Sequence, residues 1–88
     1  MVSAQVTVTN RQGFHMRPAS FFAQTMGKFR SSVTLRHGDR AVDGKSVMNL
    51  MAACMKQGTL LTVECDGPDE ADALAAAVDL IRSGLGED

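Results

Sequence analysis

The sequence contains no tryptophan and no tyrosine, and its only aromatic residues are four phenylalanines. With so few aromatic side chains in 88 residues, we expect the hydrophobic core to be built mainly from Val, Leu, Ala and Met. A chain of this length can bury one modest core and is too short for two. The sequence therefore predicts a single domain over residues 1–88.

An excess of charge of either sign is also absent, because nine basic and ten acidic residues leave a net charge of −1. This balance gives no electrostatic reason to expect nucleic acid or a membrane as a direct partner. No apolar run is long enough to span a bilayer, and the first residues lack the charged-then-apolar pattern of a signal peptide. We therefore predict a cytoplasmic protein.

Cysteine is scarce, and the two cysteines, Cys54 and Cys65, are too far apart for a Cys-x-x-Cys motif. Reduced thiols are more consistent with this pattern than a disulfide. A metal site combining them with His15 and His37 is disfavoured, because the four residues fall on separate predicted elements without ligand spacing. We predict no metal and no cofactor.

Two periodicities alternate along the chain. Apolar residues at every second position predict four short strands, and apolar residues three and four apart predict three helices. The expected elements are a strand at 2–9, a helix at 18–27, strands at 32–37 and 40–42, a helix at 47–56, a strand at 59–65 and a last helix that starts near Pro68. This βαββαβα order suggests an α+β fold, an open-faced β-sandwich with a four-stranded antiparallel sheet covered on one face by three helices.

The faces of the last two helices can also be predicted. In the helix at 47–56, Leu50 and Ala53 should serve the core, with Cys54 as a further candidate. Three methionines fall on that helix, and Met48 and Met51, with Val47, should occupy a more exposed arc. The last helix should start just after Pro68 with acidic residues in its first turn. Its predicted buried stripe consists of Ala71, Leu74, Ala75, Val78, Ile81 and Leu85.

The stretch GFHMRPAS at residues 13–20 places a histidine, an arginine and a proline at a loop-to-helix junction. Pro18 is predicted to open the helix, since it has no N–H to lose and a φ suited to a first turn. His15 and Arg17 then lie where free N–H groups and the helix dipole favour an anion. A histidine can be a nucleophile, and a guanidinium matches phosphate oxygens. These residues therefore predict a site where a phosphoryl group lies on or beside His15. The alternative, which the residues alone leave open, is that His15 and Arg17 are ordinary solvated surface side chains.

The stretch GKSVMNLM at residues 44–51 is the second informative one. Ser46 is a preferred N-cap for the helix that follows, and this role needs no further function. A phosphoryl group on Ser46 would instead place negative charge at a helix N-terminus beside apolar residues. Methionine is common on surfaces that accept several partners, so Met48 and Met51 favour a docking patch, with plain core packing as the alternative.

These motifs resemble those of the HPr family, the histidine-containing phosphocarrier proteins of the bacterial sugar phosphotransferase system. GFHMRPA at residues 13–19 is similar to the family's phosphohistidine motif, which is highly specific. GKS at 44–46 and KQGT at 56–59 resemble its regulatory-serine region. The resemblance covers essentially the whole chain, and the predicted order of elements agrees with the family's open-faced sandwich.

The resemblance implies that His15 accepts a phosphoryl group on Nδ1 from enzyme I and passes it to a histidine of a sugar-specific enzyme IIA. Arg17 would contact phosphate oxygens, and the chain would be a carrier rather than an enzyme. Ser46 would be the target of an HPr kinase/phosphorylase, after which a catabolite-control transcription factor would bind. The family also implies a monomer. The implied docking face comprises Met16, Arg17, Ser20, Gln24, Val47, Met48 and Met51.

Three residues depart from the family's pattern. Phe14 stands where Leu is usual, Met16 where Ala or Thr is expected, and Asn49 where Gly is frequent. Met16 flanks His15, so we expect it to alter partner choice or rate and not the chemistry. Two alternatives stay open: a nitrogen-branch paralogue that uses His15 in signalling, and a regulatory binding module that acts through Ser46. The presence of His15 argues against the regulatory paralogue that lacks this histidine.

Overall fold

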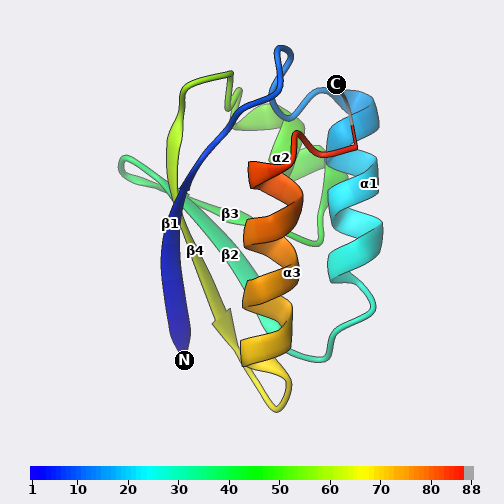
Figure 1. Cartoon of the computed structure of the whole chain (residues 1–88), viewed down its shortest axis with the longest axis vertical. Helices are drawn as coiled ribbons and strands as arrows, with labels where there is room; N and C mark the ends of the chain where they lie inside the picture. Colours follow the sequence, from blue (N-terminus) through cyan, green and yellow to red (C-terminus); the bar gives the residue numbers. More distant parts are fainter. Residues whose placement is uncertain (87–88) are drawn as a thin grey trace.

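A four-stranded antiparallel sheet forms one layer of the protein and three helices form the other (Figure 1). The computed structural model describes residues 1–86. The elements are β1 (Val2–Thr7), α1 (Met16–Met26), β2 (Ser32–His37), β3 (Arg40–Asp43), α2 (Val47–Ala52), β4 (Leu60–Asp66) and α3 (Glu70–Arg82). This order confirms the predicted βαββαβα sandwich. Within the described residues, no helix is long and apolar enough to cross a bilayer.

The sheet has the strand order β1-β4-β2-β3, so β4 lies between β1 and β2. The register pairs Cys65 of β4 with Val2 of β1 on one side and with Val33 of β2 on the other. Because side chains alternate between the two faces, Leu61, Val63 and Cys65 all point toward the helices, and each is fully buried. The opposite face is open and polar, with an Arg36–Glu64 ion pair of 2.8 Å across β2 and β4.

The core between the sheet and the helices is mostly aliphatic, as the shortage of aromatic residues predicts, with Phe14 and Phe22 as its buried aromatic residues. Its largest fully buried side chains include Phe22, Met26, Leu35 and Leu61. The thiols of Cys54 and Cys65 are both free. Burial is the largest cause that raises the pKa of the Cys65 thiol, which favours its neutral form in the core.

Two helix boundaries differ from the prediction. Helix α1 begins at Met16, so Pro18 is its third residue and does not open it. Proline is tolerated there because the first four N–H groups of a helix have no partner within the helix. Helix α2 ends at Ala52 instead of about residue 56. Cys54 then adopts a φ of +54°, which no α-helix contains, and is exposed instead of serving the core. Met55 is buried beyond the end of the helix.

The predicted stripe of α3 was partly wrong. Ala73, Ala77 and Ile81 are the buried residues of the helix, whereas Ala71 and Ala75 are exposed. Leu74 and Val78 are half-buried at the edge of the core. Alanine occurs on every side of this helix, so the apolar pattern left its rotation poorly defined. Leu85 is buried, as predicted, but it lies beyond the helix.

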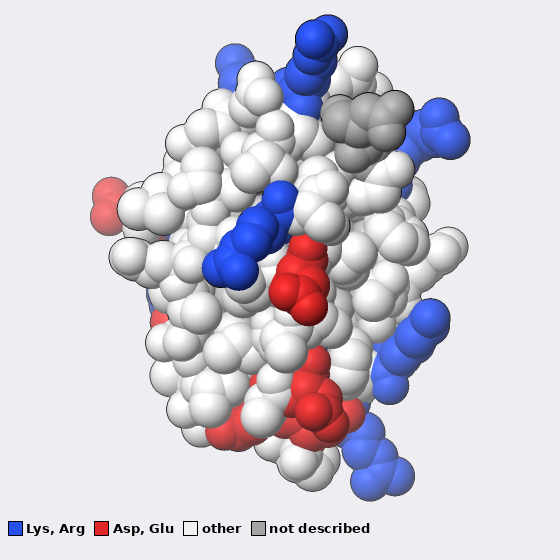
Figure 2. Space-filling view, viewed as in Figure 1, with Lys and Arg blue, Asp and Glu red and all other residues white. Residues whose placement is uncertain are grey.

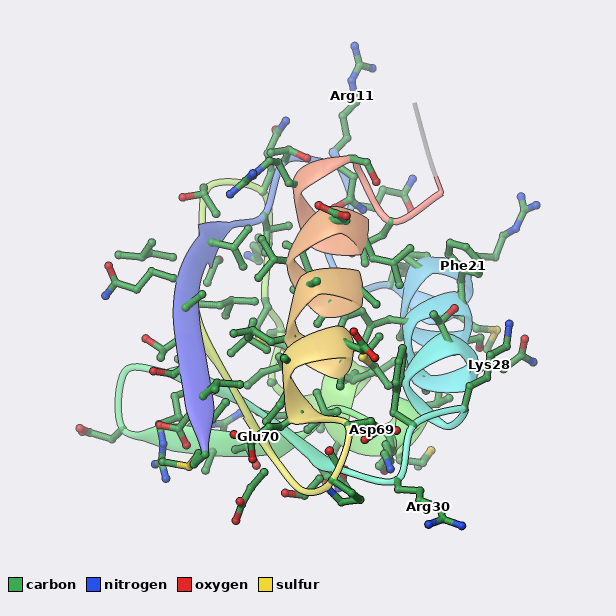
Figure 3. All side chains as sticks on the ribbon, turned by 60° about the horizontal axis from the view of Figure 1, so that its bottom comes forward. Arg11, Phe21, Lys28, Arg30, Asp69 and Glu70 are labelled. Carbon is green, nitrogen blue, oxygen red and sulfur yellow. The ribbon has the colours of Figure 1, made fainter. Side chains whose placement is uncertain are left out.

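A network of hydrogen bonds closes the end of the molecule where α3 begins, the end at which Figure 3 labels Arg30, Asp69 and Glu70. The Asp69 carboxylate accepts hydrogen bonds from the Ser31 hydroxyl and from the N–H groups of Arg30 and Ser31. The Ser31 hydroxyl is the largest cause that lowers the pKa of Asp69 from an ordinary 3.8 to about 2. The network ties the segment after α1 to the N-terminus of α3.

Candidate functional site

His15 lies at the junction between the loop that follows β1 and the start of α1. It is the N-cap residue, with an extended backbone at φ −76° and ψ −178°. Its carbonyl accepts the first hydrogen bond of the helix, from the Ala19 N–H at 2.8 Å. Within the described residues the imidazole makes no capping hydrogen bond, and the residue is exposed. The ring is therefore accessible to a large partner molecule.

The start of α1 beside His15 suits an anion. The N–H groups of Met16 and Arg17 belong to the first turn, which has no preceding carbonyls to accept them. Pro18 contributes no donor. These N–H groups and the positive end of the helix dipole favour negative charge at this position. The exposed side chain of Arg17 adds a cation that can reach phosphate oxygens.

The loop that carries His15 is anchored on two sides. On one side, Val8 exchanges hydrogen bonds with the segment before β4, from its N–H to the Thr59 carbonyl and from the Gly58 N–H to its carbonyl. On the other side, the Thr9 hydroxyl donates to the Arg82 carbonyl at the end of α3, at 3.1 Å. The exposed histidine thus stands on a loop fixed to both layers.

The residues predicted to form the docking face lie on two helices that pack against each other, α1 and α2. On α1, Met16, Ser20 and Gln24 follow each other at intervals of four and share one side of the helix. Met16 is 58% exposed, and Met48 on α2 is 78% exposed. Val47 and Met51 are half-buried against the core, so part of each side chain serves core packing.

Ser46 is the N-cap of α2, as predicted. Its hydroxyl oxygen accepts a hydrogen bond from the Asn49 N–H at 3.3 Å. The side chain is half-buried. The neighbouring Lys45 is already engaged, since its Nζ donates to the Phe29 carbonyl at 2.8 Å.

Two features of this region were not predicted. Phe21 on α1 is 44% exposed and lies against Gly86, where a Cβ would approach the ring to 3.0 Å. No signal in the sequence links residues this far apart. Asn10, in the loop between β1 and α1, is polar and yet only 2% exposed. An Asn three residues before a Gly is a turn signal, but it does not indicate that the side chain is buried.

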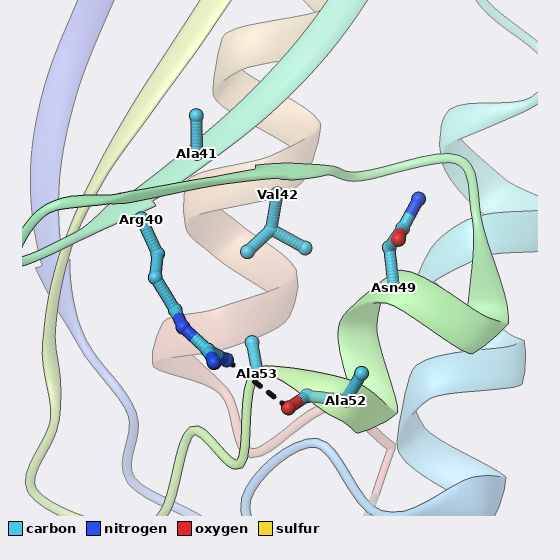
Figure 4. A pocket seen from close by; sticks show the side chains of 6 residues that line it. All are labelled: Arg40, Ala41, Val42, Asn49, Ala52 and Ala53. Atoms are coloured by element: carbon cyan, nitrogen blue, oxygen red, sulfur yellow. Dashed lines mark hydrogen bonds between the residues drawn. The ribbon is translucent and has the colours of Figure 1, made fainter.

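A shallow groove between β3 and α2 is separate from this site (Figure 4). The Arg40 guanidinium donates across it to the Ala52 carbonyl at 3.2 Å. The lining residues are Arg40, Ala41, Val42, Asn49, Ala52 and Ala53, and none of them was predicted as a site residue. The described part of the chain contains no group of three His, Cys, Asp or Glu residues arranged to hold a metal.

Charge is distributed unevenly over the face formed by α1 and α3. In Figure 2, lysine and arginine side chains lie around the rim and also near the middle of the face, beside an acidic side chain. Further acidic side chains gather toward the end where α3 begins. In the view of Figure 1, the loop after β1 and the start of α1 lie at the opposite end.

Comparison with known proteins assigns this geometry to a family. Residues 2–83 match the family model of the HPr component phosphorylation site of the phosphotransferase system. The phosphocarrier protein HPr of Xylella fastidiosa is 40% identical over 88 residues, which cover 100% of this chain and 99% of that protein. HPr of Neisseria meningitidis is 39% identical over 87 residues, which cover 99% and 98%. The chain belongs to the HPr family of phosphocarrier proteins.

Solved structures agree. HPr-C-His from Thermoanaerobacter tengcongensis superposes with a TM-score of 0.94 at 36% identity, covering 100% of this chain and 99% of that one. Crh, the catabolite repression containing protein of Bacillus subtilis, gives a TM-score of 0.77 at 32% identity and covers 99% and 100%. In that crystal structure Crh forms a dimer by domain swapping. The sandwich is thus shared by carriers and by a protein named for catabolite repression.

Proposed function

We propose that this phosphocarrier takes a phosphoryl group onto Nδ1 of His15 from phosphorylated enzyme I and passes it to a histidine of an enzyme IIA. The observation that carries the proposal is the exposed His15 at the N-terminus of α1, two residues before the exposed Arg17 in the first turn. Family membership supports it, since the matched family model describes a phosphorylation site.

The chemistry needs little from the chain beyond position and charge. The electron pair on Nδ1 of His15 forms the new P–N bond while the P–N bond to the donor histidine breaks, and that electron pair stays with the donor ring. The N–H groups of Met16 and Arg17 and the Arg17 guanidinium balance the charge on the phosphoryl oxygens. Because His15 is exposed, a donor and later an acceptor can each approach in line.

Loading can be tested with phosphoenolpyruvate and a bacterial enzyme I, followed by intact mass. We expect one added phosphate that is lost in acid, as a phosphohistidine is. The His15→Ala variant should gain none, and Arg17→Ala should gain the phosphate more slowly. No phosphate from several enzyme I sources would contradict the proposal.

The six docking residues Met16, Ser20, Gln24, Val47, Met48 and Met51 fit a face that two different partners use in turn. Met48 is the most informative, because it is 78% exposed and contributes little to the core. Replacing it with Lys should raise KM for enzyme I and leave the fold intact. The Leu60→Lys variant is a matched control, since Leu60 is 54% exposed on β4, away from α1 and α2.

Regulation through Ser46 is the second proposal. Its hydroxyl lies at the start of α2, the helix that presents Met48, so a phosphoryl group there would add negative charge beside the docking face. An HPr kinase/phosphorylase would load it, and a catabolite-control transcription factor would bind the product. Ser46→Asp should slow transfer from enzyme I, whereas Ser46→Ala should not. Equal rates in both variants would contradict this role.

The nitrogen-branch alternative uses the same histidine, so it differs only in its partners. Comparing transfer from sugar-branch and nitrogen-branch enzyme I with the same chain separates the two. We expect faster loading by the sugar-branch enzyme.

A further inference from the structure

The loop between β1 and α1 contains one buried polar side chain, Asn10, between exposed residues. Thr9, Arg11 and Gln12 are exposed, and Figure 3 shows Arg11 projecting away from the body of the protein. Asn10, between them, is only 2% exposed. A polar side chain buried in a surface loop must make good hydrogen bonds to offset its lost contact with water.

The hydrogen bonds of Asn10 close the loop on itself. Its Nδ2 donates to the Gly13 carbonyl at 2.8 Å, and its own carbonyl accepts from the Gly13 N–H at 3.2 Å. Gly13 adopts a φ of +59°, which turns the chain toward the segment before β4. A side chain and a backbone group therefore hold the same four-residue turn.

The side-chain bond fixes one particular peptide plane. The Gly13 carbonyl and the Phe14 N–H belong to the same planar peptide group and point in opposite directions. Asn10 holds the carbonyl end, and the Met55 carbonyl accepts from the Phe14 N–H at 3.0 Å. With both ends held, this peptide group cannot rotate about the chain axis without breaking a hydrogen bond.

The next link leads directly to the histidine. Phe14 is buried and packs edge-on against Phe22 of α1, with ring centroids 5.4 Å apart. Its Cα is therefore fixed by the peptide before it and by its own ring. His15 follows one residue later, and its Cα lies one peptide unit, about 3.8 Å, from that anchored point. Consequently, the orientation of the backbone at His15 depends on the Asn10 amide.

We propose that Asn10 is a positioning residue for phosphoryl transfer. Its buried amide locks the Gly13–Phe14 peptide group and so holds the His15 imidazole where partners can reach it in line. The inference rests on the proposed function of His15, because it concerns the rate at which that histidine is loaded. Asn10 does not touch the phosphoryl group in this account.

The test compares variants at two buried polar positions, Asn10 and Ser31. Asn10→Ala deletes the amide beneath the His15 loop, and Asn10→Asp keeps its shape but cannot donate to the Gly13 carbonyl when ionised. Ser31→Ala is the control, since Ser31 is fully buried and its hydroxyl bonds Asp69 at the opposite end of the molecule. Initial rates of loading from phosphorylated enzyme I are measured at a temperature where all variants are folded.

For both Asn10 variants we expect kcat to fall on the order of tenfold to a hundredfold, because a small misplacement of a reacting group costs rate steeply. KM should stay unchanged, since the docking side chains are untouched. Ser31→Ala should lose stability without losing kcat. By NMR, the Phe14 amide should exchange faster in both Asn10 variants, and the His15 ring signals should shift.

The two levels of the account can fail separately. If the original chain takes no phosphoryl group, the proposed function is overturned. If the original chain is loaded on His15 while both Asn10 variants keep its kcat, the role of Asn10 alone is overturned. A fall in kcat equal to that of Ser31→Ala would likewise show that Asn10 contributes only stability.

Discussion

Gly13 and Gly38 form a matched pair for measuring how tightly the His15 loop is packed. Both have a φ of +59°, which L-residues adopt at a cost of about 1–2 kcal/mol. An added Cβ at Gly38, in the turn between β2 and β3, would meet nothing within 4 Å. An added Cβ at Gly13 would lie 2.0 Å from the Met55 carbonyl oxygen and 2.8 Å from the Lys56 Cα. Alanine therefore meets the same backbone strain at both positions, whereas the steric clash occurs only at residue 13.

The clash has a size that can be worked from the structure. Ordinary contact begins at 3.4 Å, so the backbone at Gly13 and the Met55 carbonyl must separate by 1.4 Å from the 2.0 Å approach. Both groups are backbone, and no flexible side chain can yield instead. Overpacking of this kind costs about 1–3 kcal/mol. Gly38→Ala should lose about 1–2 kcal/mol of unfolding free energy, and Gly13→Ala should lose about 1–3 kcal/mol more.

Urea unfolding at neutral pH measures both free energies, with the original chain as the reference. The loading rate from enzyme I supplies a second comparison, because the shift at Gly13 would displace Phe14 and His15 while the turn at Gly38 is remote from them. Gly13→Ala should therefore load more slowly and Gly38→Ala should load normally. Equal free-energy losses in the two variants would refute the close packing described for the loop.

Three further predictions follow from other parts of the structure. Arg17→Ala should lower kcat/KM for loading on the order of tenfold to a hundredfold, with unfolding unchanged, since the side chain is exposed; an unchanged rate would exclude its phosphate contact. Cys54→Gly should raise the unfolding free energy by about 1 kcal/mol, because Cys54 has a φ of +54° that glycine adopts without strain; a destabilised variant would contradict this. The pKa of Asp69 is lowered to about 2 in the folded chain from the ordinary 3.8 of an unfolded one. The ionised carboxylate therefore stabilises the fold above about pH 4, and this stabilisation is lost as the pH falls toward 2. In urea titrations over that range, Ser31→Ala should lose less stability than the original chain, and parallel curves would argue against the Ser31–Asp69 bond as the cause.

Local sequence signals were sufficient for most of the fold. Alternation identified β2 with its observed bounds, and the strand predicted at 40–42 corresponds to β3, which ends one residue later. Ser46 caps α2 because a hydroxyl at that position can accept from an N–H three residues later. Each of these features depends on residues that are close together in the chain.

The wrong predictions concern features that depend on contacts between segments far apart in the sequence. Helix α2 ends early because the chain must bring the Met55 carbonyl to the Phe14 N–H, a contact between segments about 40 residues apart. This contact between Met55 and Phe14 follows a residue in the left-handed backbone conformation, Cys54. A glycine at that position would have signalled the conformation, and the sequence has a cysteine there. The burial of Asn10 likewise depends on packing that no local pattern contains.

For the candidate site too, the sequence identified residues within one local motif and not the groups contributed from elsewhere in the chain. The motif was sufficient to identify His15 and Arg17, because the chemistry depends on residue types at fixed spacing along one helix start. It could not show how the histidine is held, since the holding groups at Asn10 and Met55 come from outside the motif. The docking residues occupy adjoining helices, and their roles stay predictions.

The most direct test of the account is a complete relay with one preparation of the chain. It is loaded with phosphoenolpyruvate and enzyme I, separated from both, and then mixed with a IIA domain while the phosphate on each protein is followed by intact mass. The account predicts one phosphate on His15 that moves to the IIA domain, and neither step in His15→Ala. A phosphate that is loaded on another residue, or one on His15 that no IIA domain removes, would contradict it.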